Sequence, residues 1–495
     1  QTPLQTIQIA QNMDDRLSRA RTLAARALLP MAIVAPLLML VLWWLINRSL
    51  APLERTRQQV AARTSPECHS VFPDRLPRVQ SAATMGPGEC DGRGGHMAGV
   101  RGRTSRWAWA LGVALAGATL AGCVPDIGGG GGPTTTEPTV VVGDDQIRLN
   151  QIQLVGSHNS YHIAPEGTIL IPLTLGGLAV PGLVEGLGNP LSLNYTHAPL
   201  PTQLQRGVRT FELDVYADPL GGRFSVPRLV ELFNVQQPNI PPGLDQPGLK
   251  VLHIADVDFL TTCVTLQACL GQIRTWSDAH PGHLPIVIDV ELKGEGLGLP
   301  AELGFTPIVP FDGPQLDAVD AELRAAIGDR LITPDDVRQG ASTLREAITT
   351  TGWPTVAESR GKVLVFLDNE GLRSSYVSGH PSLEGRAMFT SSVPGQPDAA
   401  IIKENTPNDG ATIRGLVEQG YIVRTRADDD TVPDPSVARR EIALASGAQI
   451  VHTDYPPGEP RFNTGYQVTF GTKVASRCNP VTTTASTCTA AAVIE

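Results

Sequence analysis

The sequence lacks the patterns by which small zinc sites are recognised. It contains seven cysteines, but they form no Cys-x-x-Cys pair and no cluster with histidine. It also lacks a basic stripe, because 49 Asp and Glu residues outnumber 39 Lys and Arg residues and the net charge is −10. These absences argue against a zinc domain and predict no nucleic-acid partner. An anionic ligand would therefore need local positive charge, from a bound metal ion or from a few arginines and lysines.

Four of the cysteines stand in two close pairs, Cys263 with Cys269 and Cys478 with Cys488. In an exported protein each pair can close a small disulfide loop, and this is what we expect here. The alternative is that all four are free thiols buried in the core.

The chain starts with Gln1 rather than Met, and an apolar run of membrane-spanning length covers residues 27–46. The residues from 65 to 96 show no periodicity. We interpret residues 1–96 as an upstream or non-native segment that contains a transmembrane-like helix at 27–46. The alternative is a protein with two membrane segments.

Residues 97–123 have the order of a signal peptide. Met97 is followed by three arginines, by a short apolar stretch over residues 107–120, and by Leu-Ala-Gly before Cys123. This order resembles a bacterial lipoprotein signal, in which the cysteine is lipidated and becomes the new N-terminus. A second membrane helix is the alternative, but the stretch is short for one. We therefore expect an exported protein, either a cell-envelope lipoprotein anchored to the membrane through Cys123 or a secreted protein, with residues 124–147 as a flexible linker.

From residue 148 onward, short apolar runs alternate with helix-like stretches. The expected strands are Ile152–Ser157, Val208–Val215, Leu249–Ile254, Leu284–Leu292, Val363–Asp368, either Ala387–Ser391 or Ala400–Lys403, Tyr421–Arg426 and Gln449–Thr453. The expected helices are Leu266–His280, Pro314–Ile327, Ser342–Thr349, Thr412–Gln419 and Pro435–Ser446. About eight alternating units predict an α/β fold, a TIM (β/α)8 barrel over residues 148–470, followed by a tail over residues 471–495 that holds the second cysteine pair.

Polar side chains stand at the C-terminal ends of six of these strands. They are His158 and Asn159, Glu212 and Asp214, His253, Glu291, Arg424 and Arg426, and Asp454. Glu212 and Asp214 are two residues apart, so their side chains face the same way. Because the C-terminal ends of barrel strands carry the active site, the pattern predicts that these groups meet at one rim. A single such residue is more often a cap or a solvated group, but the joint placement argues for a functional site.

Two of these motifs are specific. Gly156-Ser157-His158-Asn159-Ser160-Tyr161 resembles the first-strand motif of the phosphatidylinositol-specific phospholipases C, and Gly207-Val208-Arg209-Thr210-Phe211-Glu212-Leu213-Asp214 resembles the second. Leu252-His253 and the run ending at Glu291 match the third and fourth in order and spacing. The resemblance covers residues 149–466 and is closest to the bacterial calcium-dependent members. It implies a TIM-barrel phosphodiesterase that cleaves phosphatidylinositol-type lipids to diacylglycerol and a cyclic inositol phosphate.

The resemblance also implies the site. Calcium would be bound by hard oxygen ligands from Asn159, Glu212, Asp214 and Glu291. The substrate's own 2-hydroxyl would attack phosphorus, with His253 as general acid and as base if water later opens the cyclic product. His158 would hydrogen-bond the phosphoryl oxygens. Either Glu212 or Glu291 would take the proton of the nucleophile.

Four further residues are expected to bind the substrate: Arg424, Arg426, Lys293 and Asp454. Asp256 and Asp368 are weaker candidates at the same rim. For the two arginines, a surface salt bridge with residues 428–430 is an equal alternative.

Two other functions stay open. A glycerophosphodiester phosphodiesterase has the same barrel, the Glu-x-Asp pair and a later histidine, but it opens with His-Arg-Gly where this chain has His158-Asn159-Ser160. The second alternative is a non-catalytic surface barrel, against which the complete set of two histidines and four oxygen ligands argues. We expect a monomer that meets a phospholipid or another phosphodiester substrate at a membrane surface.

Overall fold

A computed structural model describes residues 142–176, 187, 189–299, 301–429, 431–471 and 473–495. They belong to one compact unit, Asp126–Glu495. The predicted segments 1–96 and 97–123, with the apolar run at 27–46 and Cys123, lie outside the described residues. Within the described part of the chain, no helix has both the length and the apolar character needed to cross a bilayer.

Eight parallel strands form a barrel. They are β1 (Ile152–Ser157), β2 (Thr210–Asp218), β4 (Ile286–Leu292), β6 (Val363–Leu367), β7 (Phe389–Thr390), β8 (Ile401–Lys403), β9 (Ile422–Arg426) and β10 (Ile450–Thr453). Apart from β7 and β8, each pairs in parallel with the next, and β10 pairs with β1 to complete the ring. β7 and β8 are joined by a single bridge from Ser391 to Ile401, so the ring is weakest there. The predicted barrel class is confirmed.

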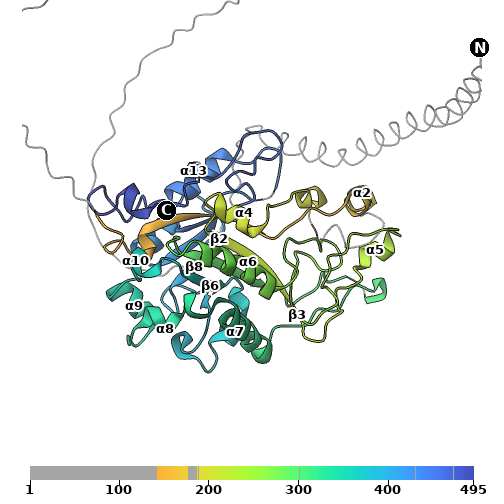
Figure 1. Cartoon of the computed structure of the whole chain (residues 1–495), viewed down its shortest axis with the longest axis horizontal. Coiled ribbons are helices and arrows are strands. Elements are labelled where there is room, and N and C mark those ends of the chain that lie inside the picture. The colour runs from red at the N-terminus through yellow and green to blue at the C-terminus, as the bar shows by residue number, and fades with distance from the viewer. Residues whose placement is uncertain (1–141, 177–186, 188, 300, 430, 472) are drawn as a thin grey trace, which may run out of the picture. The chain divides into compact units, whose positions relative to one another are not determined.

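Helices lie around these strands, as Figure 1 shows for α6 to α9. They are α2 (Gly167–Gly176), α4 (Leu200–Gln205), α5 (Arg228–Leu232), α6 (Leu266–Ala279), α7 (Gly313–Ile327), α8 (Pro334–Arg338), α9 (Leu344–Thr350), α10 (Val356–Ser359), α11 (Arg373–Val377), α12 (Ala411–Glu418) and α13 (Val437–Ala445). The five predicted helices are α6, α7, α9, α12 and α13, each confirmed within two residues at both ends.

Helix α6 shows why this prediction succeeds. Leu266, Leu270 and Ile273 recur at intervals of four and three residues, and all are buried. The side chain of Thr265 accepts a hydrogen bond from the backbone N–H of Ala268 and so caps the first turn. The apolar period and the cap are both written in the local sequence.

The prediction that Leu249–Ile254 forms the third strand of the barrel is wrong. β3 (Gly248–Val251) pairs antiparallel with the end of β2, with Val251 opposite Val215 and Gly248 opposite Asp218. The last residues of the long strand β2 need a partner, because the barrel neighbour β4 ends at Leu292. A short apolar run does not reveal the direction of the strand it joins, so the sequence pattern could not exclude this pairing. Since β3 runs back toward the barrel, His253 still reaches the rim.

The barrel still has eight strands, because both segments considered for the sixth predicted strand form strands, β7 and β8. Two short strands were not predicted. β5 (Leu331–Ile332) pairs in parallel with the start of β6, and β11 (Ser476–Cys478) pairs antiparallel with β1.

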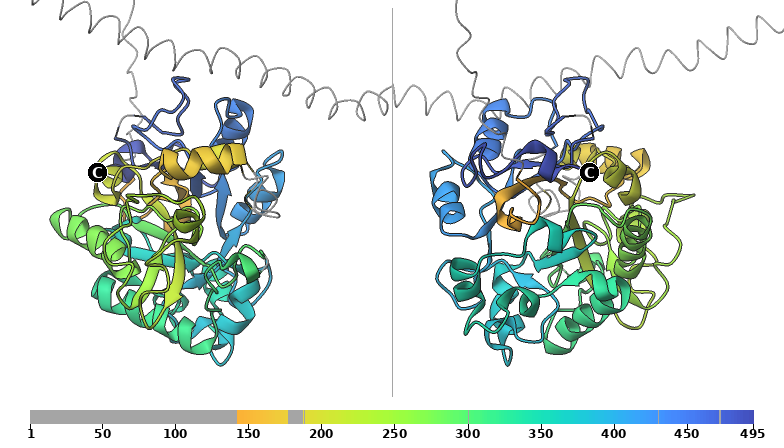
Figure 2. Two further views of the ribbon diagram at one scale, coloured as in Figure 1. Left: turned by 90° about the vertical axis from the view of Figure 1, so that its right-hand side faces the viewer. Right: turned by 60° about the vertical axis from the view of Figure 1, so that its left-hand side comes forward.

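Both ends of the predicted barrel domain extend further than expected. Val142 and Ile147, in the predicted linker, are buried in the main core. At the other end, the C-terminal segment carries β11 and lies beside the orange N-terminal strand in Figure 2. The disulfides Cys263–Cys269 and Cys478–Cys488 are both present, which confirms the predicted pairs.

The barrel interior is charged between β2, β4, β9 and β10. Arg424 is buried and donates from Nη2 to Glu212 Oε2 at 2.6 Å, and its Nε lies 3.4 Å from Asp289. His452 Nδ1 lies 3.2 Å from Arg424 Nε and 3.1 Å from Glu212 Oε2. Gly156 leaves room for this ring, because a methyl group there would lie 2.5 Å from it. A charged group in this place is stable only because its neighbours carry the opposite charge.

This interior makes the stability dependent on pH. Burial, and next the guanidinium of Arg424, lower the pKa of His452 to about 4 from an ordinary value of 6.5. Between these values the unfolded chain binds more protons than the folded one, so the free energy of unfolding falls as the pH drops from about 6.5 to about 4. This ring should contribute on the order of 3 kcal/mol to that fall.

The expected result for His452→Asn is a flatter profile, because the amide oxygen can accept from Arg424 but does not titrate. Urea unfolding in steps between pH 4 and pH 7 measures the free energy in both proteins. An equally steep loss of stability in the variant would contradict the assignment to His452.

Candidate active site

The turn after β1 is held against β2. Ser160 Oγ donates to the carbonyl of Ser157 at 2.9 Å and accepts from the N–H of Glu212 at 2.8 Å. Asn159 has a backbone φ of 47°, a left-handed conformation that asparagine tolerates better than most residues. Its side-chain amide donates to the hydroxyl of Tyr195 at 3.1 Å. The Ser-His-Asn-Ser sequence therefore builds a tied turn at the barrel rim.

Three carboxylates meet beside this turn. Asp214 and Glu291 are register partners on β2 and β4, and Glu212 precedes Asp214 by two residues on the same face. One carboxylate oxygen from each of the three lies within 4.8 Å of the other two. Burial raises the pKa of Asp214 well above its usual range, against the opposing charge of Lys293. Among the described residues, neither Asp214 oxygen has a hydrogen bond of good geometry.

Lys293 supplies a positive charge to two of these groups. Its Nζ lies 3.0 Å from Asp214 Oδ2 and 2.7 Å from Glu291 Oε1. Burial acts to lower the pKa of Lys293, but the charges of the two carboxylates outweigh it and raise the pKa above its usual value. A residue predicted to bind substrate is therefore a cation in contact with two predicted metal ligands.

The donor set fits calcium. Carboxylate and amide oxygens are the ligands that Ca²⁺ prefers, and the buried Asp214 oxygens would gain partners from a bound cation. Asn159, Asp214 and Glu291 line one cavity. Glu212 belongs to the same group, because one of its carboxylate oxygens lies within 4.8 Å of an oxygen of Asp214 and of Glu291. The structure thus brings the three predicted carboxylate ligands together, and Asn159 lines the same cavity as two of them.

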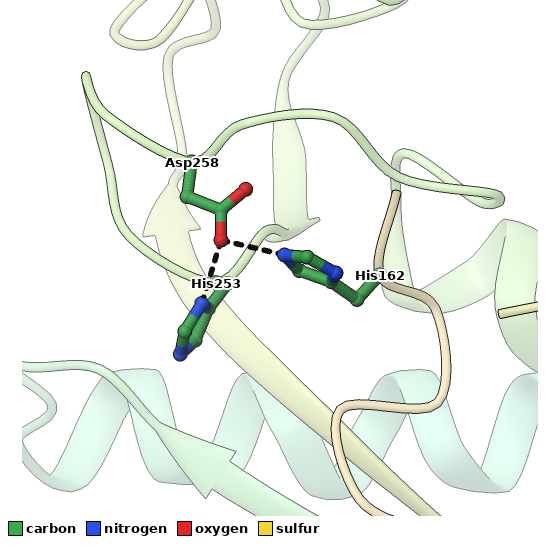
Figure 3. A group of neighbouring side chains, drawn as sticks. All are labelled: His162, His253 and Asp258. Carbon is green, nitrogen blue, oxygen red and sulfur yellow. Dashed lines mark hydrogen bonds and ion pairs between the residues drawn. The ribbon is translucent and has the colours of Figure 1, made fainter. Parts of the chain in front are cut away.

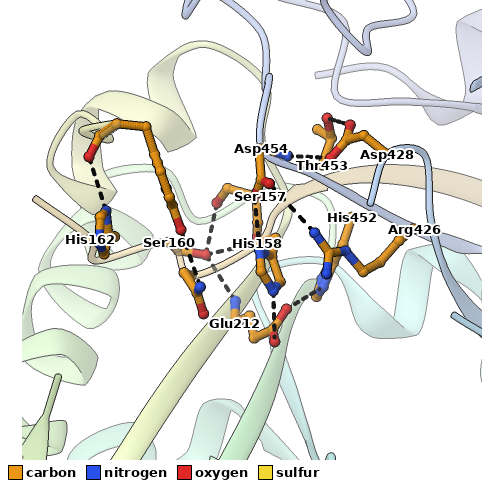
Figure 4. Close-up of polar contacts among 12 residues, drawn as sticks. Ser157, His158, Ser160, His162, Glu212, Arg426, Asp428, His452, Thr453 and Asp454 are labelled. Atoms are coloured by element: carbon orange, nitrogen blue, oxygen red, sulfur yellow. Dashed lines mark hydrogen bonds and ion pairs between the residues drawn. The ribbon is translucent and has the colours of Figure 1, made fainter. Parts of the chain in front are cut away.

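His158 lies between two carboxylates, as Figure 4 shows. Its Nδ1 is 2.7 Å from Asp454 Oδ1, and its Nε2 is 3.7 Å from Glu212 Oε1. Burial acts to raise the pKa of Glu212, but the charges of His158 and Arg424 hold it well below the usual range. Burial also acts to raise the pKa of Asp454, but the charges of His158 and Arg426 hold it below its usual value. Both carboxylates are therefore ionised at neutral pH.

Asp428 holds Asp454 in place. Its Oδ1 accepts from the backbone N–H of Asp454 at 2.9 Å, and its Oδ2 accepts from the hydroxyl of Thr453. Burial, and next the charge of Asp454, raise the pKa of Asp428 to about 6. Arg426 Nη2 lies 3.4 Å from Asp454 Oδ2. Asp454, predicted to bind substrate, is therefore placed to orient His158.

His253 lines the cavity from the loop after β3. Its Nδ1 lies 2.8 Å from Asp258 Oδ2, while its Nε2 has no hydrogen-bond partner among the described residues. The side chain is 19% exposed, so a reactant can reach it. Burial lowers the pKa of His253 below its usual value, although Asp258 opposes this. Nε2 is therefore the ring nitrogen that is free to exchange a proton with a reactant in the cavity.

A cavity of about 500 Å³ joins these groups. Its polar wall contains His158, Asn159, Asp214, His253, Glu291, Lys293, Arg426 and Asp454. Leu187, Leu193 and Phe305 form part of an apolar wall. A cavity of this size, with a few converging polar groups, suits a small-molecule headgroup.

Three predicted rim residues have other partners. Arg424 is buried and paired with Glu212, so both the predicted headgroup contact and the alternative surface salt bridge are wrong for it. Asp368 pairs with Lys403 Nζ at 2.8 Å. Asp256 lines the cavity, but its carboxylate accepts hydrogen bonds from the backbone N–H of Arg228 and from Thr306. A position at a strand end does not reveal such partners, because they come from other parts of the chain.

Four residues of the site were not predicted from the sequence: His162, Tyr195, Asp258 and Asp428. Apart from His162, which stands next to the first-strand motif, none carries a recognisable pattern. They lie outside the regular helices and strands, where no periodicity marks the buried positions.

Solved structures with some similarity include three bacterial enzymes. A calcium-dependent phosphoinositol-specific phospholipase C from Pseudomonas sp. is 18% identical, with a TM-score of 0.41, over 69% of this chain and 98% of that chain. A Ca²⁺-dependent phosphatidylinositol-specific phospholipase C from Streptomyces antibioticus is 18% identical, with a TM-score of 0.39, over 62% and 95%. The phosphatidylinositol-specific phospholipase C of Listeria monocytogenes is 13% identical, with a TM-score of 0.33, over 63% and 91%. Among curated proteins none matches the chain.

The family model described as "Phosphoinositide phospholipase C, Ca2+-dependent" matches residues 147–480, which is more than half of the chain. The matched range contains β1 to β11, both cavity histidines and the four predicted calcium ligands. The chain therefore belongs to the Ca²⁺-dependent phosphoinositide phospholipase C family.

Proposed function

We propose that the chain cleaves phosphatidylinositol-type lipids and releases diacylglycerol and a cyclic inositol phosphate. The observation that carries this proposal is the meeting, in one cavity, of two aspartate-bound histidines with the carboxylates of a calcium site. The family is calcium-dependent and acts on phosphoinositides, in agreement with this reaction.

His253 is the general acid of the proposed reaction. The alkoxide of the departing diacylglycerol needs a proton, and His253 Nε2 faces the cavity while Asp258 holds Nδ1. After this transfer the neutral ring can accept a proton from a water molecule. The oxygen of that water would then attack phosphorus and open the cyclic product. One residue therefore serves both steps.

His158 is the proposed donor to the phosphoryl oxygens. Asp454 fixes its ring through Nδ1. Glu212 is a poor base, because its pKa is held low and its Oε2 already accepts from Arg424. Glu291 lines the cavity and is the better candidate to take the proton of the nucleophile.

Asn159, Glu212, Asp214 and Glu291 would hold the calcium ion. Bound calcium supplies positive charge that neutralises the phosphodiester and makes a nearby hydroxyl more acidic. Lys293 would then give up part of its contact with Asp214 and Glu291, because like charges repel. Its ammonium and the guanidinium of Arg426 would meet phosphate or hydroxyl groups of the substrate.

Phosphorus NMR of the products tests the reaction. Purified protein is incubated with phosphatidylinositol and, separately, with glycerophosphocholine, each with and without calcium. We expect a cyclic inositol phosphate from the inositol lipid, whose 2-hydroxyl lies beside the phosphate, and no cleavage of glycerophosphocholine. Cleavage of glycerophosphocholine with no cyclic product would instead favour a glycerophosphodiester phosphodiesterase. Calcium binding without turnover of either would favour a binding barrel.

We further propose that the protein is exported, acts as a monomer, and is anchored to the cell-envelope membrane through lipidated Cys123. The signal-like order of residues 97–123 supports the export and the anchor, and the two disulfides, which persist in oxidising compartments, support the export. Cys123→Ser should move the protein from the membrane fraction to the soluble fraction and abolish labelling with radioactive palmitate. Unchanged labelling would overturn the proposed anchor.

We predict that His158→Ala and His253→Ala each lower kcat by about 10²- to 10⁴-fold, because each removes a proton-transfer or charge-stabilising group. The rate of diacylglycerol release measures this, and circular dichroism checks the fold. His380→Ala is the control and should keep full activity, because this ring does not line the cavity and is hydrogen-bonded to the carbonyl of Glu384. Full activity in either test variant would refute its role.

We predict that a chelator removes activity reversibly and that Asp214→Asn abolishes the calcium-induced rise in melting temperature. A ligand at about 100 times its Kd stabilises the fold by about 2.7 kcal/mol, which a thermal scan detects. Asp329→Asn, a change at an exposed side chain, is the matched control and should keep the rise. Chelator-resistant turnover, or a normal rise in Asp214→Asn, would count against the calcium site.

A further inference from the structure

A third histidine shares the carboxylate that holds His253. Figure 3 shows the carboxylate of Asp258 between the two rings. Its Oδ2 lies 2.8 Å from His253 Nδ1 and 2.6 Å from His162 Nε2. His162 and Asp258 are fully buried. Within the described residues, the other oxygen of Asp258 has no hydrogen-bond partner. The two histidines are therefore the side-chain contacts that fix this carboxylate.

These distances are those of hydrogen bonds. Ligands of a tetrahedral zinc ion, about 2.1 Å from the metal, would stand about 3.4 Å apart. Here the same oxygen contacts both nitrogens at shorter range. Burial acts to raise the pKa of Asp258, but the two histidines lower it, so the group is a carboxylate that accepts from both rings. The cluster thus orients side chains and leaves no space for an ion between them.

His162 is itself held from its other side. Its Nδ1 lies 3.0 Å from the carbonyl oxygen of Tyr195, and the two rings stack with centroids 4.1 Å apart. The hydroxyl of Tyr195 accepts from Asn159, a predicted calcium ligand. A continuous set of contacts therefore runs from the calcium site to the acid of the reaction.

We propose that His162 is a positioning residue for His253. By donating from Nε2 to Asp258, it holds the carboxylate where it can accept from Nδ1 of His253, and this keeps Nε2 of His253 toward the cavity. Without His162, Asp258 would be held through His253 alone and the carboxylate could rotate. In the neutral state His253 would then populate both tautomers, and only the one protonated at Nδ1 has its basic nitrogen in the cavity. The kinetic part of this inference rests on the proposed function.

Two variants separate the role from general damage. In His162→Gln the side-chain amide reaches about as far as Nε2 and can still donate to Asp258. In His162→Asn the amide is shorter by one methylene group and cannot. If the Asn variant fails to fold, His162→Leu replaces it, since an apolar side chain of similar volume suits a dry site. His283→Leu removes another buried histidine, bonded to Ser277 and Leu284, and controls for the loss of a buried ring.

The first readout needs neither substrate nor calcium. Nitrogen-15 NMR of the imidazoles should show neutral His253 protonated at Nδ1 in the wild type, in His162→Gln and in His283→Leu. In His162→Asn it should show a mixture of tautomers. A pure Nδ1–H tautomer in His162→Asn would overturn the proposal, whatever the chain cleaves.

The second readout is the split between kcat and KM with phosphatidylinositol. We expect kcat of His162→Asn to fall about 10- to 100-fold with KM changed less than twofold, and His162→Gln to recover most of the loss. Equal kcat in the Asn variant and the wild type, or no recovery with Gln, would overturn the proposal. If the wild type does not cleave this lipid, the proposed function fails, while the tautomer measurement still decides the role of His162.

Discussion

Carboxylates gathered at the mouth of a barrel repel one another, and burial makes the repulsion stronger because little water screens it. Glu212, Asp214 and Glu291 form such a group, and positively charged neighbours offset their repulsion. Arg424 contacts Glu212 from inside the barrel, and Lys293 contacts Asp214 and Glu291. The oxygens of Asp214 still lack good hydrogen bonds within the described chain. This remaining need is what calcium can meet.

The same requirement explains why Arg424 lies inside the barrel. A guanidinium at the rim could contact substrate, but here it pairs with Glu212 and lies 3.4 Å from Asp289, in a place that apolar side chains fill in most barrels. Removing such a partner leaves an unpaired buried charge, which is strongly destabilising. The active site and the stability of the fold therefore depend on one set of contacts.

The two cavity histidines have different surroundings, and this difference suits different tasks. His158 contacts Asp454, whose position is set by Asp428 and Arg426. His253 contacts Asp258, which is shared with His162. Each carboxylate occupies Nδ1 of its histidine, so in both rings Nε2 is the atom left for chemistry. Placing two imidazoles in separate carboxylate environments is a general way to divide proton donation from charge stabilisation.

Local pattern was enough for much of the fold and for several of the residues that line the cavity. The apolar period of α6 and α13, the all-apolar strand β6, and the spacing of Glu212 and Asp214 depend on neighbours along the chain, and the sequence by itself determined them. It also determined which residues stand at the ends of strands and can supply oxygen ligands. The tertiary structure alone decided the direction of β3, the inward position of Arg424, and which aspartate contacts each cavity histidine. These contacts join residues that are distant along the chain or lie in loops without a period, such as His162 and Asp258, and only the closure of the barrel brings them within hydrogen-bond distance.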